Sequence, residues 1–325
     1  MLKPLLLCAL ALSSFSFAFA QDITSVAPAS VSIGTTITIQ GSGFGTKKPS
    51  VFLTTEGSTK KITLKVTSYS DTQIEAVAST GTPGTFDVNV KSGNTTITEQ
   101  DALTLGVPVI TQISPGSATP GATVTLVGSL FGATKGKLAL NGKTVNSATW
   151  TDTSVTFVLP SNAVNGGSLI SMTTKIGTGT AGELLTVTGG ANPPASLGNP
   201  KVECTINGAK FKAKLVLGSK FGNAYNFTGT TTGSNAMAVG ILAVVPQAPI
   251  VLDETEFPLL SQLIFVETAT ATTWSSSNTG GSKKIFVTTK SGDSISGFFQ
   301  GVLTVAGKPD KVVTGGSFVL KPQSF

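Results

Sequence analysis

Two short segments have spacings that could support chemistry. Ser58 and Lys61 are spaced like a serine–lysine pair, in which the amine activates the hydroxyl as a nucleophile. That spacing puts both groups on one face of a helix, whereas the surrounding Thr and Gly residues predict a loop or a strand. The segment from Gly132 to Lys137 has glycines and a lysine like those of a phosphate-binding loop. It is one residue short, however, and no helix is predicted after it. We interpret both segments as ordinary loops or strands.

The composition removes many of the side chains on which catalysis depends. The 325 residues include no histidine, and every one of the 22 basic residues is lysine. The sequence therefore lacks the commonest general base and metal ligand, and also the bidentate guanidinium group. The carboxylates are too scattered to suggest a glycosidase-like pair. We predict a protein that is not an enzyme and that needs no cofactor.

The charge of the protein also argues against nucleic acid as a partner. The formal net charge is +6, and the lysines occur as scattered pairs with no aromatic residues between them. A nucleic-acid site concentrates its basic residues on one face and commonly uses arginine to contact bases. We expect these lysines to lie at solvated turns and strand ends.

Two further groups of residues could bind a ligand. Asp253, Glu254 and Glu256 form an acidic cluster whose oxygens could hold calcium, although the interpretation that we favour is a solvated loop before Pro258. Trp274 lies in a polar segment of Thr, Ser and Asn residues, which predicts an exposed ring that could contact a glycan.

The N-terminus has the pattern of a secretory signal peptide. Lys3 precedes an apolar run, and Ala18-Phe19-Ala20 supplies a cleavage site, so residues 1–20 are predicted to be removed. We expect an exported protein in the periplasm, on the cell surface or outside the cell, without a transmembrane span. The mature chain keeps one cysteine, Cys204. It therefore cannot form an intrachain disulfide, and the alternating pattern around Cys204 predicts a buried thiol.

An internal repeat organises the first two thirds of the chain. Two stretches match at a constant separation of 87 positions, and a Tyr/Trp-Ser/Thr-Asp-Thr segment follows in both, starting at Tyr69 and Trp150. One unit of about 85 residues is therefore present twice. The matched residues of the first copy are Pro28, Gly34, Gly41, Phe44 and Gly45, and those of the second are Pro115, Gly121, Gly128, Phe131 and Gly132.

Each copy of the repeat is predicted to be a small antiparallel sandwich. The segments at 36–39 and 123–126 alternate between polar and apolar residues, and glycine or proline turns separate such segments along the chain. We expect Phe44 and Phe131 to insert between two sheets, with flanking glycines in tight turns. Because Tyr69 and Trp150 are at equivalent positions, a packing role is predicted for both.

The repeated pattern resembles the IPT/TIG domain, an immunoglobulin-like sandwich. The resemblance covers residues 23–105 and 108–189, and the second copy matches better because Val158-Leu159-Pro160 supplies the expected ending. The resemblance implies a spacer or interaction module in which the matched residues are structural. We therefore expect sandwiches at 21–106 and 107–189.

The remaining sequence predicts a linker at 190–200, rich in Gly and Pro, and a β-rich sandwich or barrel-like domain at 201–325. The C-terminal part is loosely similar to uncharacterised bacterial secreted β-domains. The whole chain is thus predicted to be all-β. We expect a binding protein that recognises protein or polysaccharide at the cell envelope, by surface complementarity and possible strand addition at a sheet edge. The alternative is a carrier with a cavity for a small apolar ligand in the C-terminal domain.

Overall fold

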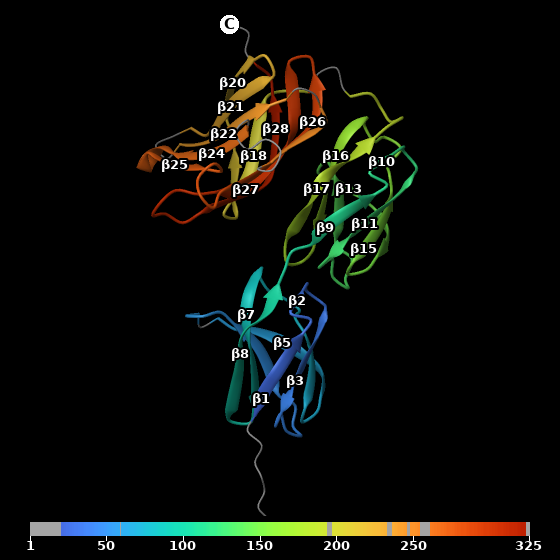
Figure 1. Cartoon of the computed structure of the whole chain (residues 1–325), viewed down its shortest axis with the longest axis vertical. Helices are drawn as coiled ribbons and strands as arrows, with labels where there is room; N and C mark the ends of the chain where they lie inside the picture. The colour runs from blue at the N-terminus through green and yellow to red at the C-terminus, as the bar shows by residue number, and fades with distance from the viewer. Residues whose placement is uncertain are drawn as a thin grey trace, which may run out of the picture. The chain divides into compact units, whose positions relative to one another are not determined.

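The computed structural model describes residues 21–58, 60–193, 197–232, 236–245, 248–253 and 261–322 (Figure 1). Apart from one short 3-10 helix, their regular secondary structure is all strand, which confirms the predicted all-β fold. The chain divides into two compact units, one up to Gly106 and one from Val107 onward. The predicted signal peptide lies outside the described residues.

The first unit is a sandwich in which one strand joins the two layers. The first half of β5 pairs with β4 and its second half pairs with β6, so the hydrogen-bonded order is β1-β3-β6-β5-β4-β7-β8-β2. All neighbours are antiparallel except β2 and β8. The strands are β1 (Asp22–Ala27), β2 (Ser30–Val31), β3 (Thr36–Ser42), β4 (Ser50–Thr54), β5 (Ile62–Tyr69), β6 (Gln73–Val77), β7 (Gly84–Ser92) and β8 (Thr95–Leu105).

The second unit begins with a sandwich of two separate sheets. One has the order β14-β15-β11-β9 and the other the order β10-β17-β16-β12-β13. The strands are β9 (Val109–Ser114), β10 (Ser117–Ala118), β11 (Thr123–Ser129), β12 (Lys137–Leu140), β13 (Lys143–Val145), β14 (Ser147–Trp150), β15 (Ser154–Val158), β16 (Gly166–Thr173) and β17 (Thr178–Val187).

The C-terminal domain, which is also part of the second unit, packs a six-stranded sheet against a five-stranded sheet. Their orders are β19-β18-β28-β27-β26-β23 and β20-β21-β22-β24-β25. A short 3-10 helix, η1 (Thr268–Thr270), lies between two of the strands. The strands are β18 (Lys201–Ile206), β19 (Ala209–Lys212), β20 (Leu215–Phe221), β21 (Ala224–Thr230), β22 (Met237–Val244), β23 (Ile250–Asp253), β24 (Ser261–Glu267), β25 (Thr272–Ser275), β26 (Ser282–Ser291), β27 (Ser294–Leu303) and β28 (Lys311–Leu320).

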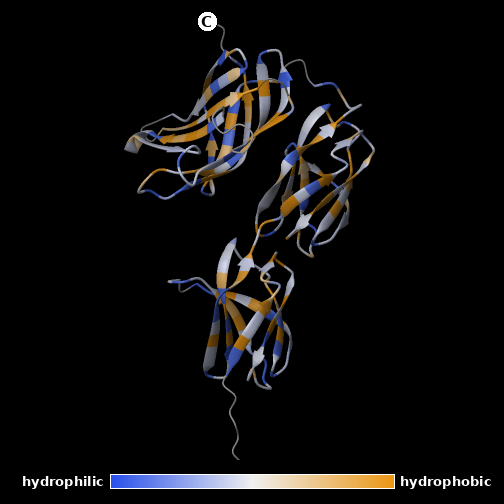
Figure 2. Ribbon diagram, in the orientation of Figure 1, coloured by the Kyte–Doolittle hydropathy of each residue, from blue (hydrophilic) through white to orange (hydrophobic). Residues whose placement is uncertain are grey.

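Apolar and polar residues alternate along many of these strands, as Figure 2 shows. Since successive side chains of a strand point to opposite faces, the alternation buries one face of each sheet. In the C-terminal domain, large aromatic side chains fill the space between the two sheets. They are Phe211, Tyr225, Phe227, Phe265, Trp274, Phe299 and Phe318.

The repeated residues form the same local structure in both sandwiches. Phe131 is fully buried, and a Cβ on Gly128 would lie 2.7 Å from its ring, so this glycine makes room for the aromatic side chain. The following Gly132 has a φ of 81°, which favours glycine. Its N–H donates to Asp152 Oδ1 at 2.7 Å, and Trp150 Nε1 donates to the carbonyl oxygen of Phe131 at 3.2 Å.

The first copy repeats this arrangement except at the aromatic residue. Phe44 is buried, Gly45 has a φ of 83°, and the N–H of Gly45 donates to Asp71 Oδ1 at 2.8 Å. Tyr69 stands where the second copy has Trp150, and its side chain is exposed, so the packing role predicted for Tyr69 is wrong, whereas Trp150 packs against the core of the second sandwich. The motif thus packs an aromatic ring between the sheets, while an aspartate holds the turn that follows it.

Candidate functional site

Trp274 was expected on the surface, but its side chain is only 2% exposed. The expectation of an exposed ring is therefore wrong. Trp274 is on β25 and faces the core, where its ring lies 5.7 Å from that of Phe265. The sequence did not predict this orientation, because the neighbours of Trp274 are polar and β25, with four residues, is too short to show a clear alternation.

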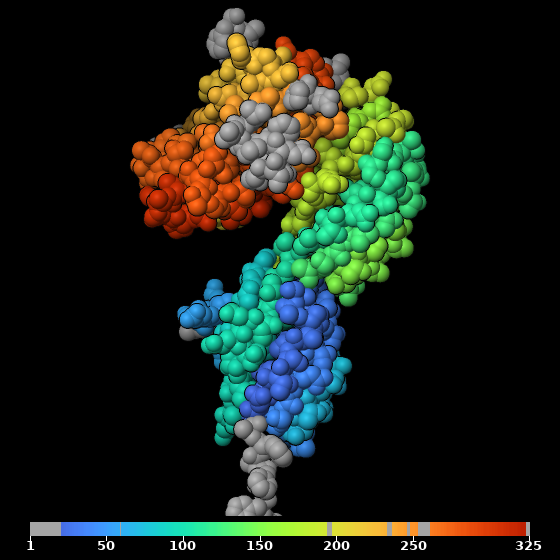
Figure 3. Space-filling model, viewed as in Figure 1, coloured from blue at the N-terminus to red at the C-terminus, as the bar shows by residue number. Residues whose placement is uncertain are grey.

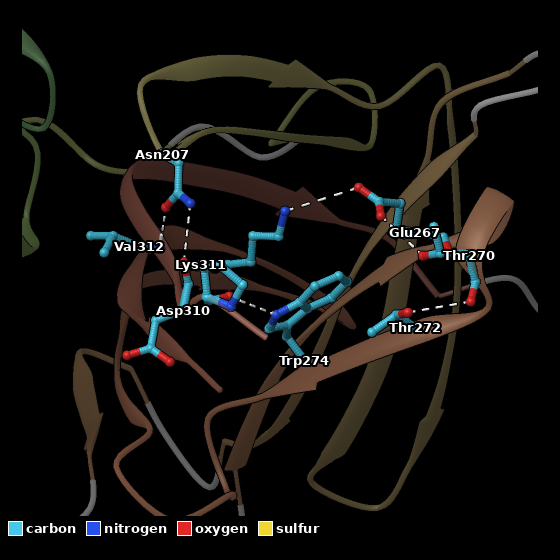
Figure 4. A network of polar contacts seen from close by, with 9 residues as sticks. Asn207, Glu267, Thr270, Thr272, Trp274, Asp310, Lys311 and Val312 are labelled. Carbon is cyan, nitrogen blue, oxygen red and sulfur yellow. Dashed lines mark hydrogen bonds and ion pairs between the residues drawn. The ribbon is translucent and has the colours of Figure 1, made fainter. Parts of the chain in front are cut away.

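A network of polar contacts surrounds Trp274 (Figure 4). Its indole N–H donates to the carbonyl oxygen of Pro309 at 3.1 Å. Lys311 Nζ lies 4.6 Å from the centre of the indole ring and 3.9 Å from Glu267 Oε1. Each polar group thus has a partner within the domain, so this network has a structural role.

The acidic cluster before Pro258 cannot be placed. Glu254 and Glu256 lie outside the described residues, and Asp253 ends β23 with a side chain that is not described. Within the described parts of the chain, no group of three His, Cys, Asp or Glu side chains could hold a metal ion. The solvated loop thus stays a prediction, with calcium binding at these three residues as its alternative.

A junction inside the second unit brings the second sandwich against the outer face of the six-stranded sheet. Strands β16 and β26 lie side by side there (Figure 1). Phe286 of β26 points away from the core of its own domain but is only 1% exposed, and Leu169 of β16 is also buried. At Gly167 the contact is so close that a Cβ would lie 2.4 Å from Pro249 Cβ.

Two β-bulges shape the strands at this junction. In β17, the three residues 181–183 lie opposite the single residue Ile170 of β16. The carbonyl oxygen of Gly182, in the middle of this bulge, accepts a hydrogen bond from Lys284 Nζ at 3.4 Å. In β28, Thr314 and Gly315 lie opposite the single residue Gln300 of β27. Gly315 has a φ of 58°, a conformation that favours glycine. Bulges are common next to binding sites, and residues at or beside both of these bulges line a cleft.

The cleft lies between the second sandwich and the C-terminal domain and has a volume of about 310 Å³. Phe286, Phe298 and Phe299 are among its lining residues, and Phe286 and Phe298 lie opposite each other on β26 and β27. The side chain of Phe299 is buried in the core between the two C-terminal sheets. Phe286 is buried by the junction, whereas Phe298 is half-buried. The remaining lining residues are Gly142, Leu169, Ser171, Thr178, Thr180, Thr205, Gln300, Thr314, Gly315 and Gly316.

The chemistry of this lining favours a neutral, hydroxyl-rich ligand. Five Ser and Thr hydroxyls and the amide of Gln300 can donate and accept hydrogen bonds, and the half-buried Phe298 provides an apolar surface. Among the residues that the structure describes, none that lines the cleft carries an ionisable side chain. The cleft thus offers recognition groups but no general acid, general base or charged metal ligand.

A second, more open depression of about 450 Å³ lies near Lys284. It is lined by residues of β9, β17 and β23 together with Lys284, and it contains the carboxylate of Glu183. No aromatic residue is among the described residues of its lining. We therefore take the smaller cleft as the candidate site.

The sequence matches the model of the IPT/TIG domain at residues 22–105 and 108–187. The chain belongs to the IPT/TIG domain family. These two matches agree with the resemblance inferred from the repeat. No curated protein matches the sequence.

Several solved structures are similar to this IPT/TIG protein. One is a crystal structure with a xylogluco-oligosaccharide (18% identity, 70% of this chain and 54% of that chain, TM-score 0.33). Another is a surface glycan-binding protein from Prevotella bryantii (16% identity, 51% of this chain and 42% of that chain, TM-score 0.26). A third is SGBP-B of a mixed-linkage glucan utilization locus of Bacteroides ovatus, in complex with a mixed-linkage heptasaccharide (14% identity, 57% and 58%, TM-score 0.28). The matched part spans about half of the length of these structures.

Sequence reasoning missed the cleft because its walls come from distant parts of the IPT/TIG protein. Ser171 and Thr180 of the second sandwich contribute to its lining, and so do Phe298 and Gln300 of the C-terminal domain. One local signal was available, since Ser296, Phe298 and Gln300 alternate with the apolar residues that face the core. An aromatic residue on the polar face of a strand is a reasonable marker of a contact surface.

The described residues include no helix with the length and apolar character needed to cross a membrane.

The buried cysteine allows a test of the C-terminal core. Cys204 is 6% exposed, and burial raises the pKa of its thiol from 9.0 to about 12. Because the thiolate is the reactive form, we expect native protein at pH 8 to resist alkylation by iodoacetamide and urea-unfolded protein to be labelled completely. Since unfolding releases a thiol of lower pKa, this group should also reduce stability as the pH rises from about 9 to 12. Mass spectrometry measures the labelling, and rapid labelling of native protein would contradict the burial of Cys204.

Proposed function

We propose that this IPT/TIG protein is a non-catalytic, exported glycan-binding protein whose cleft between the second sandwich and the C-terminal domain holds a neutral oligosaccharide segment. The observation that carries the proposal is the described lining of the cleft, which combines the half-buried Phe298 with hydroxyl and amide groups and contains no charged side chain. A sugar ring has an apolar face that packs on an aromatic ring, and its hydroxyls form hydrogen bonds around the edge.

The packing of the junction supports the same proposal. A site gains affinity when its walls are already in place, because less conformational freedom is lost on binding. Phe286 and Leu169 are buried at the junction, and Lys284 hydrogen-bonds across it to Gly182. The two walls of the cleft are thus held together before a ligand arrives. The apolar-ligand carrier stays a prediction, and the aromatic side chains packed between the C-terminal sheets give it no support.

Export is the second part of the proposal. The support for it is the pattern of residues 1–20, with Lys3, the apolar run and the small residues before Gln21. The mature protein would then meet polysaccharide in the periplasm, on the cell surface or outside the cell.

The test is the affinity of the mature chain for neutral oligosaccharides, measured by isothermal titration calorimetry with a panel of glucan, xyloglucan and mannan fragments. We expect at least one fragment to bind, and Phe298→Ala to weaken that binding by about 10- to 100-fold, as loss of an aromatic anchor does. Gln300→Ala is expected to weaken it by up to about tenfold through loss of one hydrogen-bonding group.

Phe221→Ala is the matched control, because Phe221 is an exposed phenylalanine of the same domain that does not line the cleft. It should leave the affinity unchanged. Equal affinity of Phe298→Ala and the unaltered protein would show that the cleft is not the site, and a panel without any binding would reject the proposal.

A further inference from the structure

The C-terminal domain exposes a sheet edge with unusual side chains. Strand β20 is the last strand of the five-stranded sheet and pairs with β21 over its full length, from Leu215↔Thr230 to Phe221↔Ala224. No other strand in the described part of the chain pairs with β20. The edge therefore presents backbone N–H and C=O groups that can form hydrogen bonds with another strand.

The outer face of β20 is apolar. Leu215, Leu217 and Phe221 are 49%, 47% and 91% exposed, whereas Val216, between the two leucines, packs against the core. Proteins usually protect exposed edges with charged residues or proline. Figure 3 shows the yellow residues of this hairpin on the surface of the domain. Exposed apolar side chains beside a free edge mark an interaction surface.

The one charged side chain of β20 does not oppose such an interaction. Lys220 forms an ion pair with Asp293 of the turn between β26 and β27, and the hydrogen bond that its ammonium group donates to this carboxylate raises the pKa of the lysine. Its positive charge is thus matched within the same chain. Lys214, the next lysine, lies just before the strand.

The order of residues in β20 is complementary to itself. In an antiparallel pair of two β20 strands centred on Gly218, Leu215 would face Phe221 of the other copy at both ends, and Leu217 would face Ser219. Val216 would face Lys220, and Lys214 would face Gly222, so no two lysines would be opposite each other. Two-fold pairing therefore brings the large apolar side chains together without repulsion between like charges.

Gly218 suits the centre of such a pair. A Cβ at this position would lie 1.9 Å from the ring of Phe227, so the glycine allows this ring to cover the inner face of the edge strand. The packing of Phe227 supports the strand from below and leaves its outer face to Leu217 and Ser219.

We propose that β20 pairs antiparallel with β20 of a second copy of this chain, centred on Gly218, so that the two five-stranded sheets become one continuous sheet. This pairing is independent of the proposed glycan site, because none of the residues of β20 lines the cleft. A dimer would carry two clefts, and a polysaccharide with repeated binding segments would then bind more tightly than a single oligosaccharide does.

Sedimentation velocity of the mature chain over a range of micromolar concentrations tests the proposal. We expect a monomer–dimer equilibrium, and Leu217→Lys should raise the dimer dissociation constant by at least roughly tenfold. Val158→Lys is the control, since Val158 is a half-exposed apolar residue of the second sandwich and its replacement should leave the equilibrium unchanged. A chain that remains monomeric at every concentration would overturn the proposal.

A cross-link tests the register. In the double variant L217C/S219C, the cysteine at position 217 of one copy would face the cysteine at position 219 of the other, at a distance that allows a disulfide. Oxidation should give a covalent dimer on a non-reducing gel, and buried Cys204 should not contribute to it. A dimer that does not cross-link would overturn the β20 pairing. Retained oligosaccharide affinity in Leu217→Lys would show that a failure of the dimer leaves the glycan site intact.

Discussion

Replacing Phe131 with alanine lowers the free energy of unfolding of the second unit by ~3–5 kcal/mol, the cost of removing a fully buried aromatic side chain from a tight core. The surroundings cannot close the resulting cavity easily. The ring lies over Gly128, which has no side chain to fill the space, and the Trp150 hydrogen bond to the Phe131 carbonyl holds the backbone in place. Urea unfolding of the mature chain, followed by the fluorescence of its two tryptophans, measures the loss.

Phe44→Ala is the matched variant, since Phe44 has the same place in the first sandwich. The first unit has no tryptophan, so this variant should change the circular dichroism transition of the first unit and leave the tryptophan transition unchanged. If Phe131→Ala unfolded at the same urea concentration as the unaltered protein, Phe131 would not be a core residue of the second sandwich.

The second large effect is expected at Phe286, whose ring is buried by the contact between the second sandwich and the C-terminal domain. Phe286→Ala should cost ~3–5 kcal/mol, because the lost area is buried at a contact that also includes Leu169. Differential scanning calorimetry should show the second sandwich and the C-terminal domain unfolding at separate temperatures in this variant. The cleft should also lose affinity for oligosaccharide, since its walls are no longer held together.

Phe298→Ala distinguishes the loss of stability from the loss of oligosaccharide affinity. Phe298 lies directly opposite Phe286 in the same sheet but is half-buried, so its removal should weaken ligand binding with a much smaller loss of stability. Equal losses of stability in Phe286→Ala and Phe298→Ala would contradict the assignment of Phe286 to the junction.

Comparison of Trp274 with Phe131 shows which residues can be placed from the sequence. Phe131 belongs to a repeated local pattern in which Gly128, Gly132 and Asp152 each have a contact with the same turn. Trp274 has no such pattern around it. Its burial depends on Phe265 of the neighbouring strand and on Lys311 and Pro309, which lie more than thirty positions away in the sequence.

The sequence by itself determined the all-β class and the two IPT/TIG domains. The reason is that period-two alternation and turn glycines determine strands and turns through residues close together in the sequence, and both patterns occur in each copy of the repeat. Only the tertiary structure decided where the cleft lies and which aromatic residues line it. Those properties depend on pairing between strands far apart in the chain and on contact between two domains, and the local spacing of residues encodes neither.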